Sequence, residues 1–233
     1  MSATVLSTKK LLPHQMEILL NSGVSLVQHD FISIIPLPFE FPSKPENIII
    51  TSRNAAGILL DHQKSEMIRE RRIFCVGNRT AQFLRKGGCN IIESANYGSE
   101  LAAIIRTAYP GESFLYCCGR NRREELPTEL KKHNIKFEEI EVYDTQLTPK
   151  EFKRDFDGIM FFSPSGVRSF CQKNKIHGEI FCIGNTTAGE AALRSAKVTL
   201  ASEPSIENTL VQVVRKFGKI DSKQIKTTKH DKK

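Results

Sequence analysis

The sequence predicts an α/β protein built from two similar domains, each with a parallel β-sheet flanked by helices. Short apolar runs alternate with amphipathic stretches along the 233 residues, which is the pattern of parallel sheets covered by helices. The segments IFCVGNRTA (73–81) and IFCIGNTTA (180–188) are identical at seven of nine positions. The preceding segments IIITSRNA (48–55) and IMFFSPSG (159–166) also correspond. A repeat of about 110 residues has the length of a domain.

The first half of the chain contains four predicted strands with intervening helices. A short strand at 5–7 precedes a helix at 11–21, in which Pro13 stands in the first turn and Gly23 follows the end. We expect one extended segment at 24–37, which Pro36 and later prolines close. The wholly apolar run at 47–51 is typical of a buried parallel strand, and a helix from Asn54 to about Asp61 follows it. The next strand and helix are expected at 72–76 and 80–86.

The rest of the chain continues the alternation. We expect strands at 113–118, 136–143, 158–162 and 179–183, and helices at 124–133, 165–172, 186–195 and 206–217. The first strand and helix of the chain have no second-half counterpart, so we expect residues 1–30 to complete the sheet of residues 148–217. Residues 40–140 then form an inserted domain, with linker strands at 31–39 and 141–147. The Lys-rich residues 218–233 are predicted to be a basic disordered tail.

Composition excludes several classes of protein. The net charge is +8, but seven lysines lie after residue 215, so the basic balance does not indicate a nucleic-acid partner. The six cysteines show no CxxC pair and no metal-binding spacing, which favours free thiols in a reducing cytoplasm and no metal site. No run approaches the roughly 20 apolar residues of a membrane helix. We therefore expect a soluble, cytoplasmic protein.

The turns between strands and helices are rich in Gly, Ser, Thr and Asn. They lie at 51–54, 77–80, 119–122, 163–166 and 184–187. In a parallel α/β sheet, ligands bind beyond the carboxyl ends of the strands, where backbone N–H groups and helix dipoles attract anions. Simple helix capping explains any single turn. Five such turns in two related domains favour a donor-rich cleft between the domains that binds a polycarboxylate.

These segments resemble the uroporphyrinogen-III synthase family, over residues 31–212. The pieces that carry the resemblance are FFSPSGV (161–167), IGNTTA (183–188) and GRNRREELPTELKKHNIKFEEIEVYDT (119–145), with support from VGNRTA (76–81) and Thr51–Ser52. The resemblance implies two similar parallel-sheet domains, flavodoxin- or Rossmann-like, joined by a two-stranded ladder. It also implies a hydro-lyase of haem biosynthesis that needs no metal or organic cofactor. Hydroxymethylbilane would lose its terminal hydroxyl as water and close to uroporphyrinogen III, with its last pyrrole ring inverted through a spirocyclic pyrrolenine.

The resemblance also assigns site residues. Tyr143 is the candidate for assisting departure of the hydroxyl, and its alternative role is cross-strand packing. Carboxylate-binding roles are implied for five hydroxyl-bearing turn residues and one arginine. These are Ser52, Thr80, Ser163, Ser165, Thr187 and Arg120. Arg53 departs from the family pattern, which often has Pro and then Arg after the Thr–Ser pair, so no role is assigned to it.

Three alternatives remain open at this point. The first is a non-enzymatic, hinged two-domain module that binds a small polycarboxylate or another anion and has no need of Tyr143. The second is a sugar-nucleotide or phosphate-handling enzyme, although no turn offers the acidic metal ligand or base that it needs. The third concerns the Lys-rich tail alone and is association with nucleic acid. Two domains that enclose their own site suggest a monomer.

Overall fold

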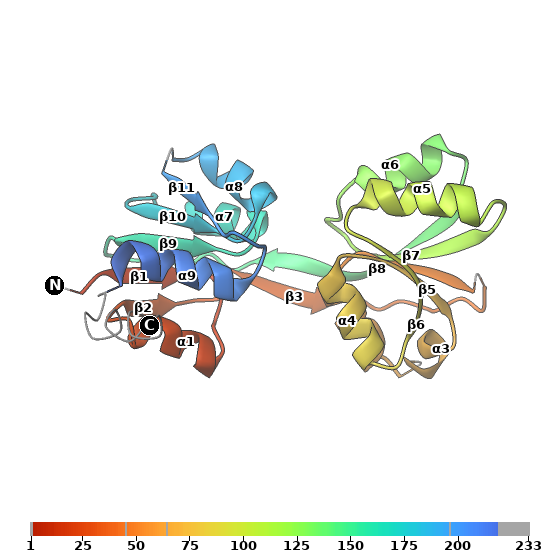
Figure 1. The fold of residues 1–233 in the computed structure, drawn as a ribbon, viewed down its shortest axis with the longest axis horizontal. Helices are drawn as coiled ribbons and strands as arrows, with labels where there is room; N and C mark the ends of the chain where they lie inside the picture. Colours follow the sequence, from red (N-terminus) through yellow and green to blue (C-terminus); the bar gives the residue numbers. More distant parts are fainter. Residues whose placement is uncertain (1, 45, 64, 196, 219–233) are drawn as a thin grey trace, which may run out of the picture. The chain divides into compact units, whose positions relative to one another are not determined.

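The computed structural model describes residues 2–44, 46–63, 65–195 and 197–218, and most of the predicted basic tail lies outside this range. The chain forms two compact units. Unit 1 consists of the chain before residue 34 and after residue 146, and unit 2 consists of residues 34–146. The division falls inside the two segments that were expected to be linkers. The chain therefore enters and leaves unit 2 through neighbouring strands (Figure 1).

Unit 1 contains a five-stranded sheet in the order β11-β10-β9-β1-β2, and all its strands are parallel. The strands are β1 (Thr4–Ser7), β2 (Ser25–Gln28), β9 (Gly158–Phe161), β10 (Glu179–Cys182) and β11 (Val198–Leu200). The central strand β9 is buried along its whole length. A central parallel strand is covered on both faces, which explains why the sequence GIMF has no polar residue.

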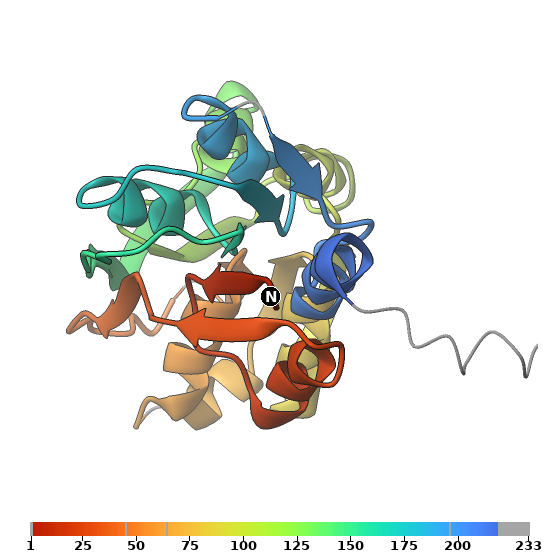
Figure 2. The ribbon, with the colours of Figure 1, turned by 90° about the vertical axis from the view of Figure 1, so that its left-hand side faces the viewer.

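Helices cover both faces of the unit 1 sheet (Figure 2). On one face, α7 (Pro164–Cys171) and α8 (Asn185–Ala192) pack against Leu6, Ile159 and Phe161. On the other face, α1 (Pro13–Leu20) and α9 (Ile206–Phe217) pack against Val5, Met160 and Phe181. Because successive side chains of a strand point to opposite faces, neighbouring residues such as Ile159 and Met160 belong to different cores.

Unit 2 contains a six-stranded sheet in the order β3-β8-β7-β4-β5-β6. The strands are β3 (Ile32–Pro36), β4 (Asn47–Ile50), β5 (Arg72–Val76), β6 (Asn90–Ala95), β7 (Ser113–Gly119) and β8 (Lys136–Leu147). Strands β4 to β8 pair in parallel with one another. The N–H of Leu37 bonds the carbonyl of Val142, and the N–H of Thr148 bonds that of Phe31, each at 3.0 Å. Residue numbers rise on one strand as they fall on the other, so β3 and β8 form an antiparallel ladder.

Helices also cover both faces of the unit 2 sheet. On one face, α2 (Arg53–Asp61), α3 (Ser65–Arg69) and α4 (Asn78–Lys86) pack against the side chains of Ile48, Ile50 and Cys117. On the other face, α5 (Gly98–Ala108) and α6 (Glu125–Lys132) pack against Ile49, Phe74 and Tyr116. The two-domain α/β fold class predicted from the sequence, with its parallel sheets, is confirmed.

Several element predictions were incomplete. The segment 24–37 is two strands, β2 and β3, because the chain bends at Phe31, whose buried ring packs on Phe170 with centroids 5.5 Å apart. The pattern did not predict α3, β6, α5 or β11. Helix α5 begins without a side-chain cap at Tyr97, and the edge strand β6 mixes apolar and polar residues. Neither element therefore carries the usual terminal or alternation signal.

Candidate functional site

The turn after β4 brings two predicted site residues together. Ser52 is the N-cap of α2, and its Oγ accepts a hydrogen bond of 3.2 Å from the N–H of Asn54. The same Oγ lies 2.9 Å from the Oη of Tyr143 on β8. Ser and Thr are favoured at N-caps because their oxygens pair helix N–H groups that lack backbone partners. The cap therefore fixes Ser52 in a position where it contacts the phenol.

Tyr143 lies at a close approach between β8 and the end of β7. It pairs with Gly119 across a register shift between Cys118 and Gly119, and its carbonyl accepts a bond of 2.9 Å from the N–H of Arg120. A Cβ placed on Gly119 would lie only 2.4 Å from Cζ and 2.8 Å from Oη of Tyr143. Only glycine admits the ring at this place. Gly119 therefore helps to place the phenol, a role that sequence reasoning missed, although it identified the turn.

The turn after β5 positions Thr80. Gly77 precedes α4 with φ = 90°, a conformation that favours glycine. Thr80 is the third residue of this helix and is 7% exposed. Arg79 also belongs to the helix, whereas Arg53 of the preceding turn places its guanidinium 5.1 Å from the centre of the Phe83 ring. Arg79 also has an interaction of its own. Thr80 contributes a neutral, buried hydroxyl to this turn.

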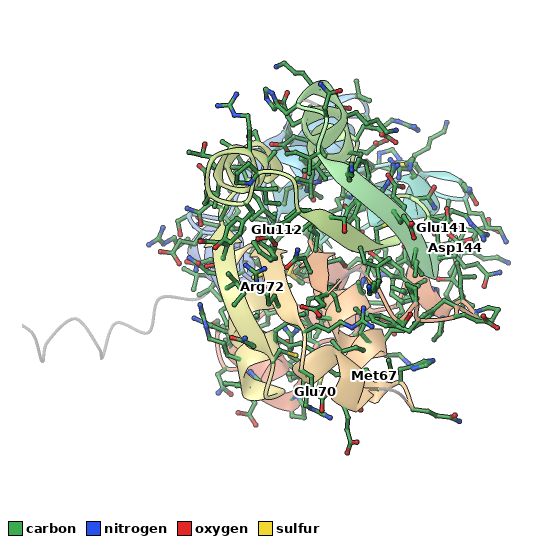
Figure 3. The ribbon with its side chains drawn as sticks, turned by 90° about the vertical axis from the view of Figure 1, so that its right-hand side faces the viewer. Met67, Glu70, Arg72, Glu112, Glu141 and Asp144 are labelled. Atoms are coloured by element: carbon green, nitrogen blue, oxygen red, sulfur yellow. The ribbon has the colours of Figure 1, made fainter. Side chains whose placement is uncertain are left out.

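The arginines after β7 are engaged with carboxylates of the same unit. The Arg120 guanidinium lies 2.9 Å from Glu141 and 3.3 Å from Asp144, and these two carboxylates follow the course of β8 (Figure 3). Arg122 donates two bonds of 2.8 Å to Glu139. The hydrogen bonds to Glu139 raise the pKa of Arg122 above its ordinary value. The positive charge expected at this turn is thus largely compensated within unit 2.

In unit 1 the turn after β9 has the same capping arrangement. Ser163 is the N-cap of α7, and its Oγ accepts a bond of 3.0 Å from the N–H of Gly166. Ser165 accepts a bond of 3.2 Å from Arg168, which also pairs with Glu190 at 2.8 Å. Thr8, which the sequence did not single out, lies beside this turn, because a Cβ added to Gly166 would be 3.6 Å from the Thr8 Oγ1. Ser163 and Ser165 therefore share one turn at the carboxyl end of β9.

Thr187 lies at the next turn of unit 1, after β10. It is the third residue of α8, its N–H donates to the Gly184 carbonyl at 3.1 Å, and it is 2% exposed. Its position matches that of Thr80 in unit 2, because both follow a Gly-Asn pair at the start of a helix. The assignments of Tyr143, Arg120 and the five hydroxyl residues to catalysis or binding stay predictions.

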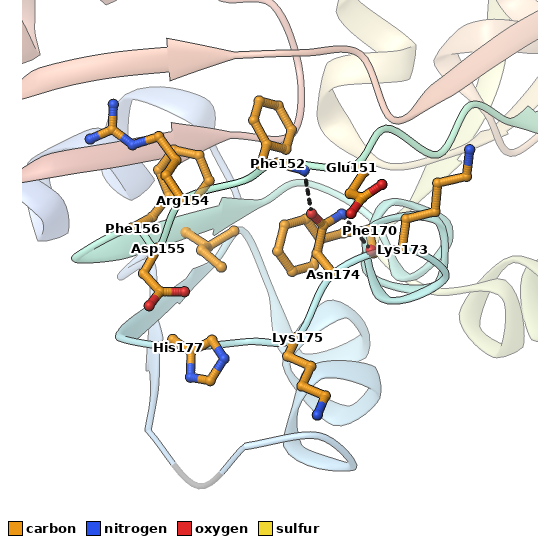
Figure 4. Close-up of a pocket in the computed structure, with 11 residues that line it drawn as sticks. Glu151, Phe152, Arg154, Asp155, Phe156, Phe170, Lys173, Asn174, Lys175 and His177 are labelled. Atoms are coloured by element: carbon orange, nitrogen blue, oxygen red, sulfur yellow. Dashed lines mark hydrogen bonds between the residues drawn. The ribbon is translucent and has the colours of Figure 1, made fainter.

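Two cavities in the described part of the chain lie away from these turns. One cavity of about 220 Å³ adjoins the amino end of β9 and is lined by Phe152, Phe156 and Asn174 (Figure 4). Arg154 and Lys175 also line it, but their charged ends point away from one another. A second cavity of about 180 Å³ adjoins the amino ends of β7 and β8. In α/β sheets, ligands bind at the opposite, carboxyl edge, so neither cavity is the candidate site.

The described residues lack the features of two further classes of site. No group of three or more His, Cys, Asp or Glu side chains that could hold a metal ion occurs there. None of the helices in the described part of the chain is both long and apolar enough to cross a membrane. The described strand ends offer hydroxyl groups, backbone N–H groups, arginines paired with carboxylates and the half-buried phenol of Tyr143.

Comparison with known proteins gives a consistent result. A family model described as uroporphyrinogen-III synthase HemD matches residues 19–210. The chain is 27% identical over 206 residues to uroporphyrinogen-III synthase of Saccharomyces cerevisiae, which covers 70% of this chain and 75% of the yeast protein. It is 25% identical to the porphyrin biosynthesis protein HemD of Ruminiclostridium josui, covering 84% of this chain and 44% of that protein.

The fold matches solved structures as well. The crystal structure of uroporphyrinogen-III synthetase from Helicobacter pylori superposes with a TM-score of 0.71 at 21% identity, covering 92% of this chain and 99% of that one. A mutant uroporphyrinogen III synthase from Thermus thermophilus gives 0.62 at 10% identity, with 92% and 98% covered. At these identities the superpositions establish the fold alone. The family match over most of the chain establishes more: this protein belongs to the uroporphyrinogen-III synthase family.

Proposed function

We propose that this protein converts hydroxymethylbilane to uroporphyrinogen III, with loss of water and inversion of the last pyrrole ring. The observation that carries the proposal is the 2.9 Å hydrogen bond between Tyr143 and Ser52, in a chain whose family is that of the synthase. This bond holds the phenol at the carboxyl end of a parallel sheet, which is where α/β enzymes place their reactive groups.

The reaction needs a proton for its leaving group. In our proposal the Tyr143 Oη gives its proton to the terminal hydroxyl of the substrate as the C–O bond breaks, and water leaves with the bonding electrons. The substituted α-carbon of the terminal pyrrole, which already carries the bridging methylene, attacks the resulting cation and forms the spirocyclic pyrrolenine. The bond from this carbon to the old bridging methylene then breaks and leaves a second cation on that methylene. The unsubstituted α-carbon of the same pyrrole attacks this cation, which inverts the ring, and the proton that this carbon loses restores the phenol. Ser52, which shares the hydrogen bond, supports the phenolate in the meantime. General acid assistance of this kind contributes roughly 10²–10⁴-fold.

Substrate binding is the second task of the polar turns. The eight carboxylates of the substrate suit neutral donors at helix N-termini, where N–H groups and the helix dipole favour an anion. Ser163 and Thr187 in unit 1, with Ser52 and Thr80 in unit 2, hold hydroxyls at such positions. Ser165 and Arg120 belong to the same proposal. Because Arg120 is already paired with Glu141 and Asp144, a substrate carboxylate has to compete with these two.

A product assay tests the proposal. Hydroxymethylbilane is generated in situ and incubated with the purified protein without added metal or cofactor, and the oxidised products are separated into uroporphyrin isomers I and III. We expect isomer III to predominate. Isomer I alone, formed in the presence of folded protein, contradicts the proposal and leaves an anion-binding module as the better account. The family match disfavours that alternative.

The remaining proposals concern the working state of the protein. We propose a monomer that acts in the cytoplasm on this small-molecule substrate, without a nucleic-acid or membrane partner. All six cysteines are free, and five of them are buried, which supports a reducing compartment. Analytical ultracentrifugation at micromolar concentration tests the monomer, and a sedimentation coefficient of a dimer contradicts it.

A further inference from the structure

A second tyrosine of unit 2 makes a hydrogen bond parallel to that of Tyr143. The Oη of Tyr116 on β7 lies 2.9 Å from the Oγ1 of Thr51. Thr51 immediately precedes Ser52, whose Oγ lies 2.9 Å from Oη of Tyr143. Two consecutive residues of one turn therefore each bond a tyrosine, and the two tyrosines come from adjacent strands, β7 and β8.

The two tyrosines bond this turn from opposite faces of the sheet. Tyr116 belongs to the core beneath α5 and α6, whereas Tyr143 packs against the core beneath α2 and α4. In the register of β4 and β7, Tyr116 pairs with Ile49, so its side chain runs along the strands to reach Thr51 on the same face. The 51–52 turn is thus held on one face through Thr51 and on the other through Ser52.

Tyr116 is a member of the hydrophobic core beneath α5 and α6. The residue is 1% exposed, and burial raises the pKa of its phenol to about 12, so the group stays neutral in the physiological range. A buried phenol needs a hydrogen-bond partner, and Thr51 supplies it. The hydroxyl of Tyr116 is therefore neutral and engaged in holding the turn through Thr51.

We propose that Tyr116 is a positioning residue, which acts through Thr51 to hold the β4–α2 turn where Ser52 meets the phenol of Tyr143. The catalytic part of this inference rests on the proposed function, but the positioning itself does not. Without the bond between Tyr116 and Thr51, the turn keeps the α2 cap and loses its attachment on one face. The bond between Ser52 and Tyr143 should then lengthen or be populated for less of the time.

Ring signals of the tyrosines test the positioning directly. The chain has four tyrosines, so protein labelled with ¹³C in its tyrosine rings gives a small set of NMR signals. We expect Thr51→Val to move the signals of both Tyr116 and Tyr143 and to leave those of Tyr97 and Tyr109 in place. Thr51→Ser keeps the hydroxyl and should restore the Tyr143 signal. A Tyr143 signal that stays in place in Thr51→Val while that of Tyr116 moves overturns the proposal.

Kinetics tests the catalytic consequence. We expect Tyr116→Phe and Thr51→Val each to lower kcat about tenfold, since small misplacements of reacting groups cost up to about 10²-fold, while KM changes less than about twofold. The double variant should be no worse than either single variant, because both remove one interaction. The matched control is Tyr109→Phe, which removes a phenol bond of 2.8 Å to Glu93 in the same unit and should leave kcat unchanged.

The outcomes separate the two proposals. Equal kcat losses in Tyr109→Phe and Tyr116→Phe, or additive losses in the double variant, contradict positioning through Thr51. Thermal midpoints of all variants identify any that fail to fold. In that case the kcat of Thr51→Ser is compared with that of Thr51→Val, and a higher kcat in Thr51→Ser supports positioning through the Thr51 hydroxyl, whereas equal values contradict it. If the wild-type protein forms no isomer III, the proposed function fails. The NMR comparison still confirms or overturns the role of Tyr116 in that case.

Discussion

The two units have the same architecture with a different starting point in the chain. In unit 2 the parallel strands follow the chain from β4 to β8 and lie in the order β6-β5-β4-β7-β8. In unit 1 the order β11-β10-β9-β1-β2 becomes identical when counting begins at β9 and continues through β1 and β2. The strand order of unit 1 is thus a circular permutation of that of unit 2. Unit 2 is inserted in the chain of unit 1 between β2 and β9, so β1 and β2 of unit 1 precede β9 in the chain although they correspond to the last two strands of unit 2.

The helices and turns follow the same correspondence. Helices α7, α8, α9 and α1 of unit 1 match α2, α4, α5 and α6 of unit 2 in their place after each strand. Ser163 matches Ser52 as a cap, and Thr187 matches Thr80. A shared backbone therefore presents matching hydroxyls in both units, as expected for turns that serve the same helix-capping and anion-binding needs.

The difference between the units lies in the phenols. All four tyrosines of the chain fall in unit 2. At the position of Thr51, unit 1 has Phe162, which cannot form the hydrogen bond that Thr51 makes with Tyr116. The two units thus carry matching hydroxyls at their strand ends, whereas the phenol that we propose as the proton donor occurs only in unit 2. We therefore expect substitutions that disturb the phenol of Tyr143 in unit 2 to affect the chemical step, and substitutions of the unit 1 hydroxyls to affect binding alone.

The largest expected effect comes from the phenol of Tyr143. In Tyr143→Phe we expect kcat for isomer III to fall about 10²–10³-fold, because the leaving hydroxyl loses its proton donor. KM should change little. Stopped-flow or quenched assays of isomer III formation measure both parameters. A variant with full kcat shows that Tyr143 serves only cross-strand packing, which is its structural alternative.

A smaller effect is expected from the glycine that seats this ring. A Cβ at Gly119 would lie 2.4 Å from Cζ of Tyr143, so Gly119→Ala has to displace the ring, and we expect kcat to fall about 10- to 100-fold. Gly57→Ala in α2 is the matched control, because nothing lies within 4 Å of its added Cβ. This control should stabilise the fold by about 0.5–1 kcal/mol and keep kcat. Equal activity of the two variants would falsify the seating role.

Unit 1 offers the test of the binding half of the comparison. In Ser163→Ala and Thr187→Val we expect KM to rise about 3- to 10-fold with kcat nearly unchanged. Each variant loses a contact with a substrate carboxylate that is equally strong in the ground state and in the transition state. Ser163→Ala should also lose about 1 kcal/mol of stability with its helix cap, measured by urea unfolding. If instead kcat falls as steeply as in Tyr143→Phe, the division of tasks between the units is wrong.

The smallest expected effect is on the pH dependence of stability, and it compares the environments of two matching buried cysteines, one in each unit. Cys75 on β5 and Cys182 on β10 hold matching positions, and burial raises the pKa of their thiols to about 11 and about 12. Unfolded thiols ionise near pH 8.5, so the unfolded chain loses protons first. Stability that is present at neutral pH is then lost as the pH rises from about 8.5 towards 11.

Denaturant unfolding at pH 8, 9 and 10 measures this loss. Each buried thiol should add about 1 kcal/mol per pH unit to the slope, and Cys75→Ala and Cys182→Ala should each reduce the slope by that amount. Cys171, which is half-buried, provides the comparison, because Cys171→Ala should reduce it less. A slope that responds to only one of the two buried cysteines shows that the matching positions differ in environment.

Much of the fold could be predicted because its signals are local. Apolar runs such as Ile48–Ile50 are too hydrophobic for an exposed strand, and Ser52 and Ser163 mark helix starts through their own hydroxyls. The repeat of IFCVGNRTA and IFCIGNTTA identified two related units. Strand β6 was missed because it mixes apolar and polar residues and forms by pairing with β5. Helix α5 was missed although its buried residues Gly98, Leu101, Ala102 and Ile105 recur at helical spacing, because its start has no side-chain cap.

The candidate site was predictable as a set of turns and not as a set of contacts. Local sequence was enough to predict the α/β class, the two related units and the hydroxyls at the strand ends, because alternation, capping and repetition are properties of neighbouring residues. The contacts of Tyr143 with Ser52, of Tyr116 with Thr51 and of Arg120 with Glu141 became known from the folded protein. These contacts join residues far apart in the chain, and strand order and register, which depend on the whole sheet, bring them together.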